Sequence, residues 1–270
     1  MAGSARVEGD ARPARGLLVS PLAAVEFLTV VRLRRASAAK QPQLAQAQLW
    51  YPAVGLGIGL LIAGLDRLLH PHLPPLTEAA LLLLALEGCT GFLHLDALAD
   101  CADGLLCVAD RTRRLEIMRD SRAGAFAITA VCLYLLLTWS ALGELAGPAR
   151  SAVLILTPVA GRFALVAVSA AFPYARPSGM GSGFREAARG PAGAVALVVA
   201  ISIAALALGP GGLLLLGTAA LAALAVGAFA GARLGGVTGD VIGSGCQVAQ
   251  ATALVVAVSL QGAAWFRPWL

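Results

Sequence analysis

The chain has 270 residues, of which 59% are hydrophobic and only 13% are charged. A soluble domain carries about 25% charged residues, so this composition excludes an ordinary soluble protein and indicates an integral membrane protein. Its aromatic residues are few, which favours packed helices over a β-barrel. The net charge of +5 is carried almost wholly by arginine, which fits membrane topology and phosphate binding rather than nucleic-acid binding.

The apolar pattern predicts an all-α, polytopic membrane helical bundle with about seven transmembrane helices. We expect one domain over residues 1–270, with residues 1–16 as a disordered tail. The stretch 17–33 is interrupted by Pro21 and Glu26, so it is predicted either as an interfacial or re-entrant helix or as an eighth element. Segments of spanning length are expected at 50–69, 77–95, 125–145, 152–172, 192–208, 212–230 and 249–265.

Arginine-rich loops alternate with loops that have few basic residues. Basic residues cluster before residue 50, at 111–122, at 176–189 and at Arg233, whereas the loop 70–75 has neither Lys nor Arg. The positive-inside rule therefore places the N-terminus and the arginine-rich loops in the cytoplasm. The charges of 110–116 are interpreted as setting this topology. Every polar motif falls on the same side, which predicts an active site that faces the cytoplasm.

The most informative motif follows the second predicted span. Asp96, Asp100 and Asp103 are spaced i, i+4 and i+7, so on a helix their side chains share one face. Like charges on one face repel, and a divalent cation among them removes that cost. Mg²⁺ prefers carboxylate oxygen, so the spacing predicts a magnesium site. His94 is either a further ligand or a residue of the membrane interface.

Three further segments have the chemistry of phosphate binding. Asp120 lies between Arg119 and Arg122 and can complete a metal site beside two guanidinium groups. The arginine at 162 falls inside a predicted span, where it needs a carboxylate or a phosphate as its partner. A glycine-rich stretch, 235–243, allows backbone N–H groups to approach phosphate, and its Asp240 can bind a second metal ion.

Four segments together resemble the cobalamin synthase family, the adenosylcobinamide-GDP ribazoletransferases. They are GFLHLDALADCADG at 91–104, MRDSRAGAF at 118–126, FPYARP at 172–177 and GGVTGD at 235–240. The resemblance extends over about residues 25–250. It implies a multi-pass enzyme of the bacterial inner membrane that requires Mg²⁺ and joins α-ribazole, or its 5′-phosphate, to adenosylcobinamide-GDP with release of GMP.

The resemblance also implies roles for individual residues. Asp96, Asp100 and Asp103 would bind the metal. The catalytic candidates, which would act as base, further ligand or charge stabiliser, are Asp120, Asp240 and Arg122. The candidates for substrate binding are His94, Arg119, Arg162, Arg176, Gly236 and Thr238. The expected partners are the two substrates and the lipid bilayer, and a homo-oligomer is compatible with the sequence.

Two positions depart from the family pattern. Ala97 replaces a usual glycine, which is a mild change, and Gln247 replaces a usual glutamate, which removes a negative charge and puts a metal or base role there in doubt. Two other classes of function stay open. One is another Mg²⁺-dependent phosphotransferase or a prenyltransferase acting on a diphosphate. The other is a cation-coupled transporter, although the acids lie at one face rather than at mid-membrane.

Overall fold

The computed structural model describes residues 13–33, 41–176 and 181–268. These residues form helices joined by short turns and contain no β-strand, which confirms the predicted all-α fold. The helices are α1 (Pro13–Leu28), α2 (Gln41–Gln46), the 3₁₀ helix η1 (Ala47–Trp50), α3 (Tyr51–Leu69), α4 (Pro75–Gly88), α5 (Leu93–Leu106), α6 (Arg111–Ile117), α7 (Ala125–Glu144), α8 (Arg150–Ala171), α9 (Gly181–Arg189), α10 (Pro191–Leu234) and α11 (Gly239–Leu260).

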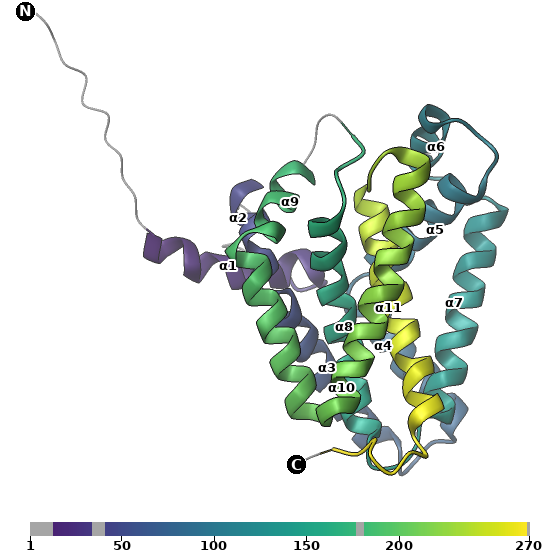
Figure 1. Ribbon diagram of the computed structural model, residues 1–270. Coiled ribbons are helices and arrows are strands. Elements are labelled where there is room, and N and C mark those ends of the chain that lie inside the picture. The colour runs from purple at the N-terminus through teal and green to yellow at the C-terminus, as the bar shows by residue number, and fades with distance from the viewer. Residues whose placement is uncertain (1–12, 34–40, 177–180, 269–270) are drawn as a thin grey trace, which may run out of the picture.

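Five helical segments of the described chain are long and apolar enough to cross a membrane, and the bent pair α4–α5 is a sixth candidate. The predicted count of seven is therefore not confirmed. The difference lies in α10, which is one element of 44 residues and contains two of the predicted spans. Its backbone is not helical at Leu208 and Gly209, so α10 folds into two arms that run in opposite directions (Figure 1).

The second predicted span, 77–95, ends earlier than expected. Helix α4 stops at Gly88, and α5 starts at Leu93 after a bend of 86°. Gly91 and Phe92 form this bend with φ near +60°, a left-handed conformation that a helix cannot continue through. Because of the bend, α5 departs from the direction of α4 and lies at one end of the bundle, where it packs against α7 and α11 (Figure 1).

Helix α8 is the central helix of the bundle, and most of its residues are buried. It packs against α3, α10 and α11. Gly55 and Gly59 of α3 let the two backbones approach closely, because an added Cβ would lie 2.7 Å from the carbonyl oxygen of Pro158 and 2.5 Å from that of Ile155. This is the small-residue contact that membrane helices use in place of hydrophobic association.

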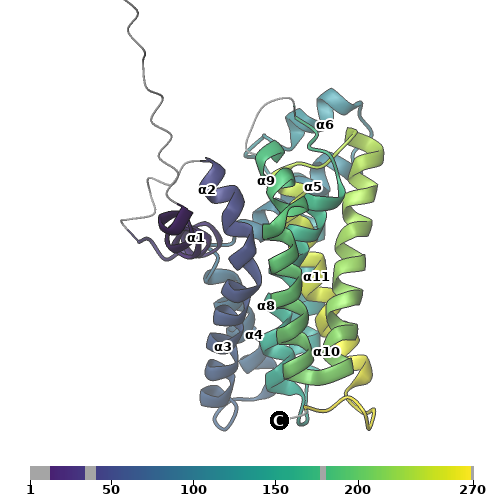
Figure 2. The same ribbon diagram turned by 60° about the vertical axis from the view of Figure 1, so that its left-hand side comes forward.

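Figures 1 and 2 place α5, α6 and α9 at one end of the bundle, here called the acidic end. The turn between α3 and α4 lies at the opposite end, as does the C-terminal end of α11. Helix α1 runs across the bundle axis rather than along it (Figure 1), which agrees with the interfacial alternative for 17–33. Of the predicted tail, residues 1–12 lie outside the described residues, whereas 13–16 form the first turn of α1.

Candidate active site

The three acids of the most informative motif lie on one continuous helix. Helix α5 includes Asp96, Asp100 and Asp103, so the predicted shared face is present in the structure. Asp96 is exposed at the acidic end, and the other two side chains are half-buried. Burial, followed by the charges of Asp96, Asp240 and Asp103, raises the pKa of Asp100 to about 6. These neighbours show that Asp240, far away in sequence, belongs to the same acidic cluster.

Asp103 has a second role that its spacing did not predict. Its carboxylate accepts hydrogen bonds from the backbone N–H groups of Gly124, at 2.6 Å, and Ala127, at 2.9 Å, at the start of α7. A carboxylate at a helix N-terminus satisfies unpaired donors and interacts favourably with the helix dipole. Gly124 allows this approach, because an added Cβ would lie 2.8 Å from the carboxylate. Asp103 therefore fastens α5 to α7.

Two loops from distant parts of the chain meet beside the acids. The N–H of Ala175 donates to the carbonyl of Val237, and the N–H of Val237 donates to the carbonyl of Pro173, each at 2.8 Å. This pairing brings Arg176 to Asp240, with an N–O distance of 3.5 Å between their charged groups. The structure thus joins the third and fourth segments of the predicted site at the acidic end.

Arg111 locks this junction in place. Its guanidinium donates to the carbonyl of Leu234, at 2.7 Å, and to the carbonyl of Ala175, at 2.6 Å. Arg114 similarly donates to the carbonyls of Gly104 and Leu105 at the end of α5. The sequence predicts only a topology-setting role for both arginines. In the structure they donate to carbonyl groups at the C-termini of α10 and α5, and Arg111 also donates to the carbonyl of Ala175 in the loop after α8. No sequence motif indicated these contacts.

Gly236 and Thr238, predicted to contact substrate, are buried in the turn before α11. An added Cβ on Gly236 would lie 2.5 Å from the carbonyl oxygen of Pro173, so this glycine lets the two loops pack. The Thr238 hydroxyl accepts a hydrogen bond from the N–H of Val241 as the N-cap of α11 and donates to Asp240. In the structure both residues shape the turn that positions Asp240, and their contact with substrate stays a prediction.

Asp120 and Arg122 form a pair on the exposed loop before α7. The Arg122 guanidinium donates to both oxygens of Asp120, at 3.0 and 2.7 Å, and these hydrogen bonds lower the pKa of Asp120 to about 2. Neither residue, both within the described chain, has a hydrogen bond or ion pair with the acids of α5. Arg119 is also exposed. This segment reaches the acidic cluster through the N–H of Gly124 but not through the side chains of Asp120 and Arg122, whose catalytic role stays a prediction.

Arg162 is fully buried in α8, and its partner differs from the expectation. Instead of a carboxylate or phosphate, the guanidinium donates to the side-chain oxygen of Gln250, at 2.8 Å. Gln250 in turn donates to Gln247, and Gln247 donates to the carboxylate of Glu87. Arg162 is thus linked to a carboxylate through two glutamines, which place this polar network inside the bundle rather than at the acidic end.

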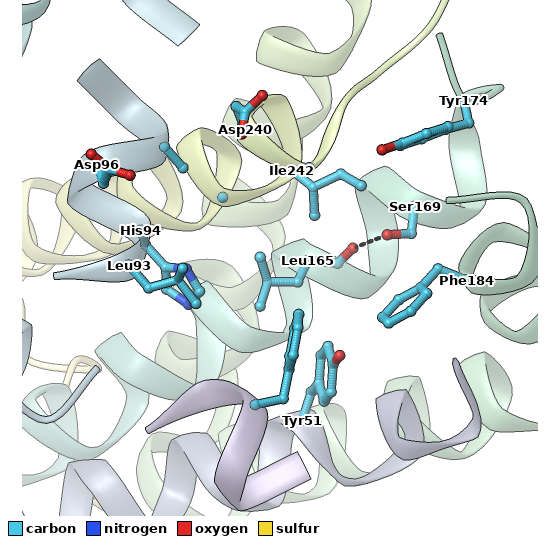
Figure 3. Close-up of a pocket in the computed structure, with 14 residues that line it drawn as sticks. Tyr51, Leu93, His94, Asp96, Leu165, Ser169, Tyr174, Phe184, Asp240 and Ile242 are labelled. Atoms are coloured by element: carbon cyan, nitrogen blue, oxygen red, sulfur yellow. Dashed lines mark hydrogen bonds between the residues drawn. The ribbon is translucent and has the colours of Figure 1, made fainter. Parts of the chain in front are cut away.

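A cavity of about 250 Å³, the aromatic cavity, lies directly beside the acids. Figure 3 shows Asp96 and Asp240 at one side of it and the rings of Tyr51, Tyr174 and Phe184 around the rest. His94 also lines the aromatic cavity and is buried, so it is not the interface residue considered from the sequence. The aromatic residues come from separate elements, and of these only Tyr174 falls in one of the segments that the sequence analysis singled out.

A second cavity of about 620 Å³ adjoins the aromatic cavity and shares Tyr174 with it. Three arginines line this second cavity: Arg176, Arg185 and Arg189. For Arg185 and Arg189 the sequence predicts only a place in a loop that sets the membrane topology. A cavity lined by guanidinium groups suits an anionic ligand such as phosphate.

The acidic cluster has the donor chemistry for Mg²⁺, because all of its candidate ligands are carboxylate oxygens. Its oxygens are not drawn together as tightly as at a preformed site. Among the described residues, the one group of three candidate ligands within 4.8 Å of one another lies at the opposite end: Asp66, His70 and Glu78. There Arg150 already pairs with both acids. The acids of α5 therefore suit a metal ion, because their ligand atoms are carboxylate oxygens and none of these carboxylates is paired with a basic side chain among the described residues.

Fold and site together define a polytopic helical membrane protein with clustered carboxylates and arginines at one end of the bundle. Comparison with known sequences adds the family. The chain belongs to the family described as cobalamin-5-phosphate synthase, whose sequence profile matches residues 20–258.

Curated relatives agree with this assignment. A protein of Pseudomonas paraeruginosa named adenosylcobinamide-GDP ribazoletransferase is 41% identical over 243 residues, which cover 89% of this chain and 98% of that protein. Proteins with the same name from Stutzerimonas stutzeri and Geotalea daltonii are 40% and 34% identical over 87% and 88% of the chain, and over 95% and 96% of their own lengths. No solved structure matches the fold.

Proposed function

We propose that the protein is an adenosylcobinamide-GDP ribazoletransferase, which joins α-ribazole or its 5′-phosphate to adenosylcobinamide-GDP and releases GMP. The reaction belongs to the last steps of cobalamin nucleotide-loop assembly. The observation that carries the proposal is the grouping of Asp96, Asp100 and Asp240 beside Arg176, in a chain whose relatives have this enzyme name. Membership of this family argues against the transporter and the other phosphotransferases.

In the proposed reaction, a hydroxyl oxygen of the acceptor attacks the phosphorus of the diphosphate that is attached to cobinamide. A new phosphorus–oxygen bond forms while the bond from that phosphorus to the bridging oxygen breaks, and GMP leaves with the bridging oxygen. The hydroxyl proton passes to a carboxylate, for which Asp240 and Asp120 are the candidates. Arg176 is placed to stabilise negative charge on the reacting phosphate, because it already lies against Asp240.

The acids of α5 would hold the metal ion. Asp96, Asp100 and Asp103 are the proposed ligands, and Asp103 also fastens α5 to α7. When bound, Mg²⁺ would neutralise charge on the diphosphate and on the departing GMP. Arg119 and Arg122, on the exposed loop before α7, are proposed as further phosphate contacts. Arg162 is buried and donates to Gln250 in this structure, so its contact with substrate stays a prediction.

We place the acidic end in the cytoplasm and the chain in the bacterial inner membrane. Supporting this orientation, the arginine-rich loops of α6, α9 and the end of α10 gather at the acidic end (Figure 1). Basic residues are retained on the cytoplasmic side during insertion. The water-soluble substrates would then reach the acids from the cytoplasm.

The proposal is tested by GMP release from the purified, detergent-solubilised protein given adenosylcobinamide-GDP, either acceptor and Mg²⁺. Asp100→Asn keeps the side-chain size but removes the charge, and we expect it to lower kcat by about 100-fold or more. Asp110→Asn is the matched control, because Asp110 caps the exposed helix α6 and asparagine is an equally good cap. Chelation of Mg²⁺ should abolish turnover, and its addition should restore it.

Two outcomes would contradict the proposal. If the folded wild-type protein releases no GMP with either acceptor, the reaction is assigned wrongly. If Asp100→Asn turns over as fast as Asp110→Asn, the reaction stands but the metal site is not at the acids of α5.

A further inference from the structure

The aromatic cavity has no part in the chemistry described above, although it touches the same acids. Four aromatic residues from four separate elements line it: Phe27 of α1, Tyr51 of α3, Tyr174 of the loop after α8, and Phe184 of α9. The first and last of these residues, Phe27 and Phe184, are more than 150 positions apart in the sequence. The fold therefore brings distant parts of the chain together around this cavity.

Three of the four rings contact one another. Phe27 stacks on Tyr51 with ring centroids 6.2 Å apart and an angle of 14° between the planes, and it meets Phe184 at 6.0 Å and 44°. Aliphatic side chains, including Leu165 and Ile242, complete the lining. The hydroxyl of Ser169 donates to the carbonyl of Leu165, as Figure 3 shows, so it is already paired. Such a lining suits a flat, largely apolar ring system.

The polar side of the aromatic cavity is the acidic cluster itself, since Asp96 and Asp240 line both. A ligand in the cavity therefore has one end among the rings and the other beside the proposed reaction centre. The cavity volume of about 250 Å³ is also informative. Cavities for drug-sized ligands occupy about 300–1,000 Å³, so this one accommodates a small ring system but not a corrin macrocycle.

We propose that the aromatic cavity binds the flat heteroaromatic base of the acceptor nucleoside and directs its ribose toward Asp96 and Asp240. This inference rests on the proposed function and assigns one of its two substrates to a subsite. The other base present in the reaction, guanine, has a polar edge that needs several hydrogen-bond partners. Apart from the two acids and His94, the cavity is lined mainly by rings and aliphatic side chains, which favours the less polar benzimidazole base of α-ribazole.

The test measures binding of α-ribazole to the full-length protein by equilibrium dialysis without adenosylcobinamide-GDP, so that no turnover is needed. Phe184→Leu removes a ring but keeps an apolar side chain, and we expect it to weaken α-ribazole binding about tenfold, because base–aromatic stacking has a comparable effect in other proteins. Phe229→Leu is the matched control, since Phe229 lies on α10 and does not line the cavity. In turnover, Phe184→Leu should raise KM for the acceptor and leave KM for adenosylcobinamide-GDP unchanged.

A second variant tests the same cavity in case Phe184→Leu does not fold. Leu165→Phe adds volume inside the cavity without removing a ring, and it should also weaken α-ribazole binding while melting like the wild type. The inference is overturned if both variants bind α-ribazole like Phe229→Leu. It is equally overturned if they weaken binding of GMP instead, because guanine would then occupy the cavity. Failure of the proposed function is distinguished by the turnover assay, because the wild-type protein would then release no GMP, whatever the result of the dialysis.

Discussion

Glu87 and Gln247 face each other inside the bundle, and their contact explains one departure from the family pattern. The Gln247 amide donates to Glu87 at 2.8 Å, and the Tyr134 hydroxyl donates to the same carboxylate at 2.7 Å. Gln247 is fully buried, and its side chain has hydrogen bonds with Glu87, Tyr134 and Gln250 rather than with the acids of α5. A glutamine here supplies the donor that a buried carboxylate needs, whereas a second carboxylate would repel it.

Restoring the family's usual glutamate should therefore destabilise this chain. We expect Gln247→Glu to lower the free energy of unfolding by about 3 kcal/mol, because it removes the amide that donates to Glu87 and places a second buried carboxylate against it. The double variant Glu87→Gln/Gln247→Glu exchanges the two groups and should recover most of this loss. Thermal unfolding in detergent measures both effects. A Gln247→Glu variant that melts like the wild type and turns over faster would instead assign a metal or base role to this position.

At the scale of elements, the placement of the acids depends on close contact between α5 and α11. Gly243 of α11 faces Ala97 of α5, and an added Cβ would lie 2.6 Å from the Cβ of Ala97. Ala97 is the other departure from the family pattern, so the alanine methyl already fills the space that a glycine would leave. No further atom fits between the two helices.

Gly243→Ala should push α5 away from α11 and lower the rate of GMP release at least tenfold, because displacements of about 1 Å at a reaction centre have costs of this order. Ala97→Gly removes the opposing methyl, so the double variant should regain most of the lost rate. Activity assays on all three variants test this contact. If the double variant is no faster than Gly243→Ala, the helix contact is not the cause of the loss.

The elements of the site were largely predictable, but their contacts were not. The i, i+4, i+7 spacing predicted the helix and the face of α5 correctly, because that periodicity is local. The cap that Asp103 provides for α7 and the carbonyl contacts of Arg111 depend on which helix ends meet, which a single sequence does not reveal. The same holds for the aromatic cavity, whose four rings are scattered along the chain. The predicted span 77–95 was too long because Gly91 and Phe92 bend the backbone within an apolar run.

At the scale of the whole molecule, two polar clusters lie at opposite ends of the bundle. The acidic end holds the candidate active site. At the other end Arg150 donates to Asp66 at 2.8 Å and pairs with Glu78 at 3.2 Å, and all three side chains are buried. This cluster ties α3, α4 and α8 together. Since its charges are already paired within the protein, we interpret it as a source of stability rather than as a second site.

Removing the arginine should leave two buried carboxylates without their cation. We expect Arg150→Met to destabilise the protein by about 3–5 kcal/mol, the usual cost of breaking a buried ion pair. Arg67→Met is the matched control, because Arg67 is exposed at the same end of α3. Thermal unfolding should separate the two variants, whereas KM for both substrates should be unchanged in the fraction that folds. A raised KM in Arg150→Met would mean that the two ends of the bundle are coupled.

The joining of α5 to the start of α11 has a consequence for biogenesis. A ribosome delivers Asp96 and Asp100 to the membrane well before Asp240, with both arms of α10 inserted in between. A nascent chain therefore has no complete acidic cluster and no complete aromatic cavity until α11 is in place. Chains released early by the ribosome would occupy the membrane without consuming the nucleotide-activated precursor.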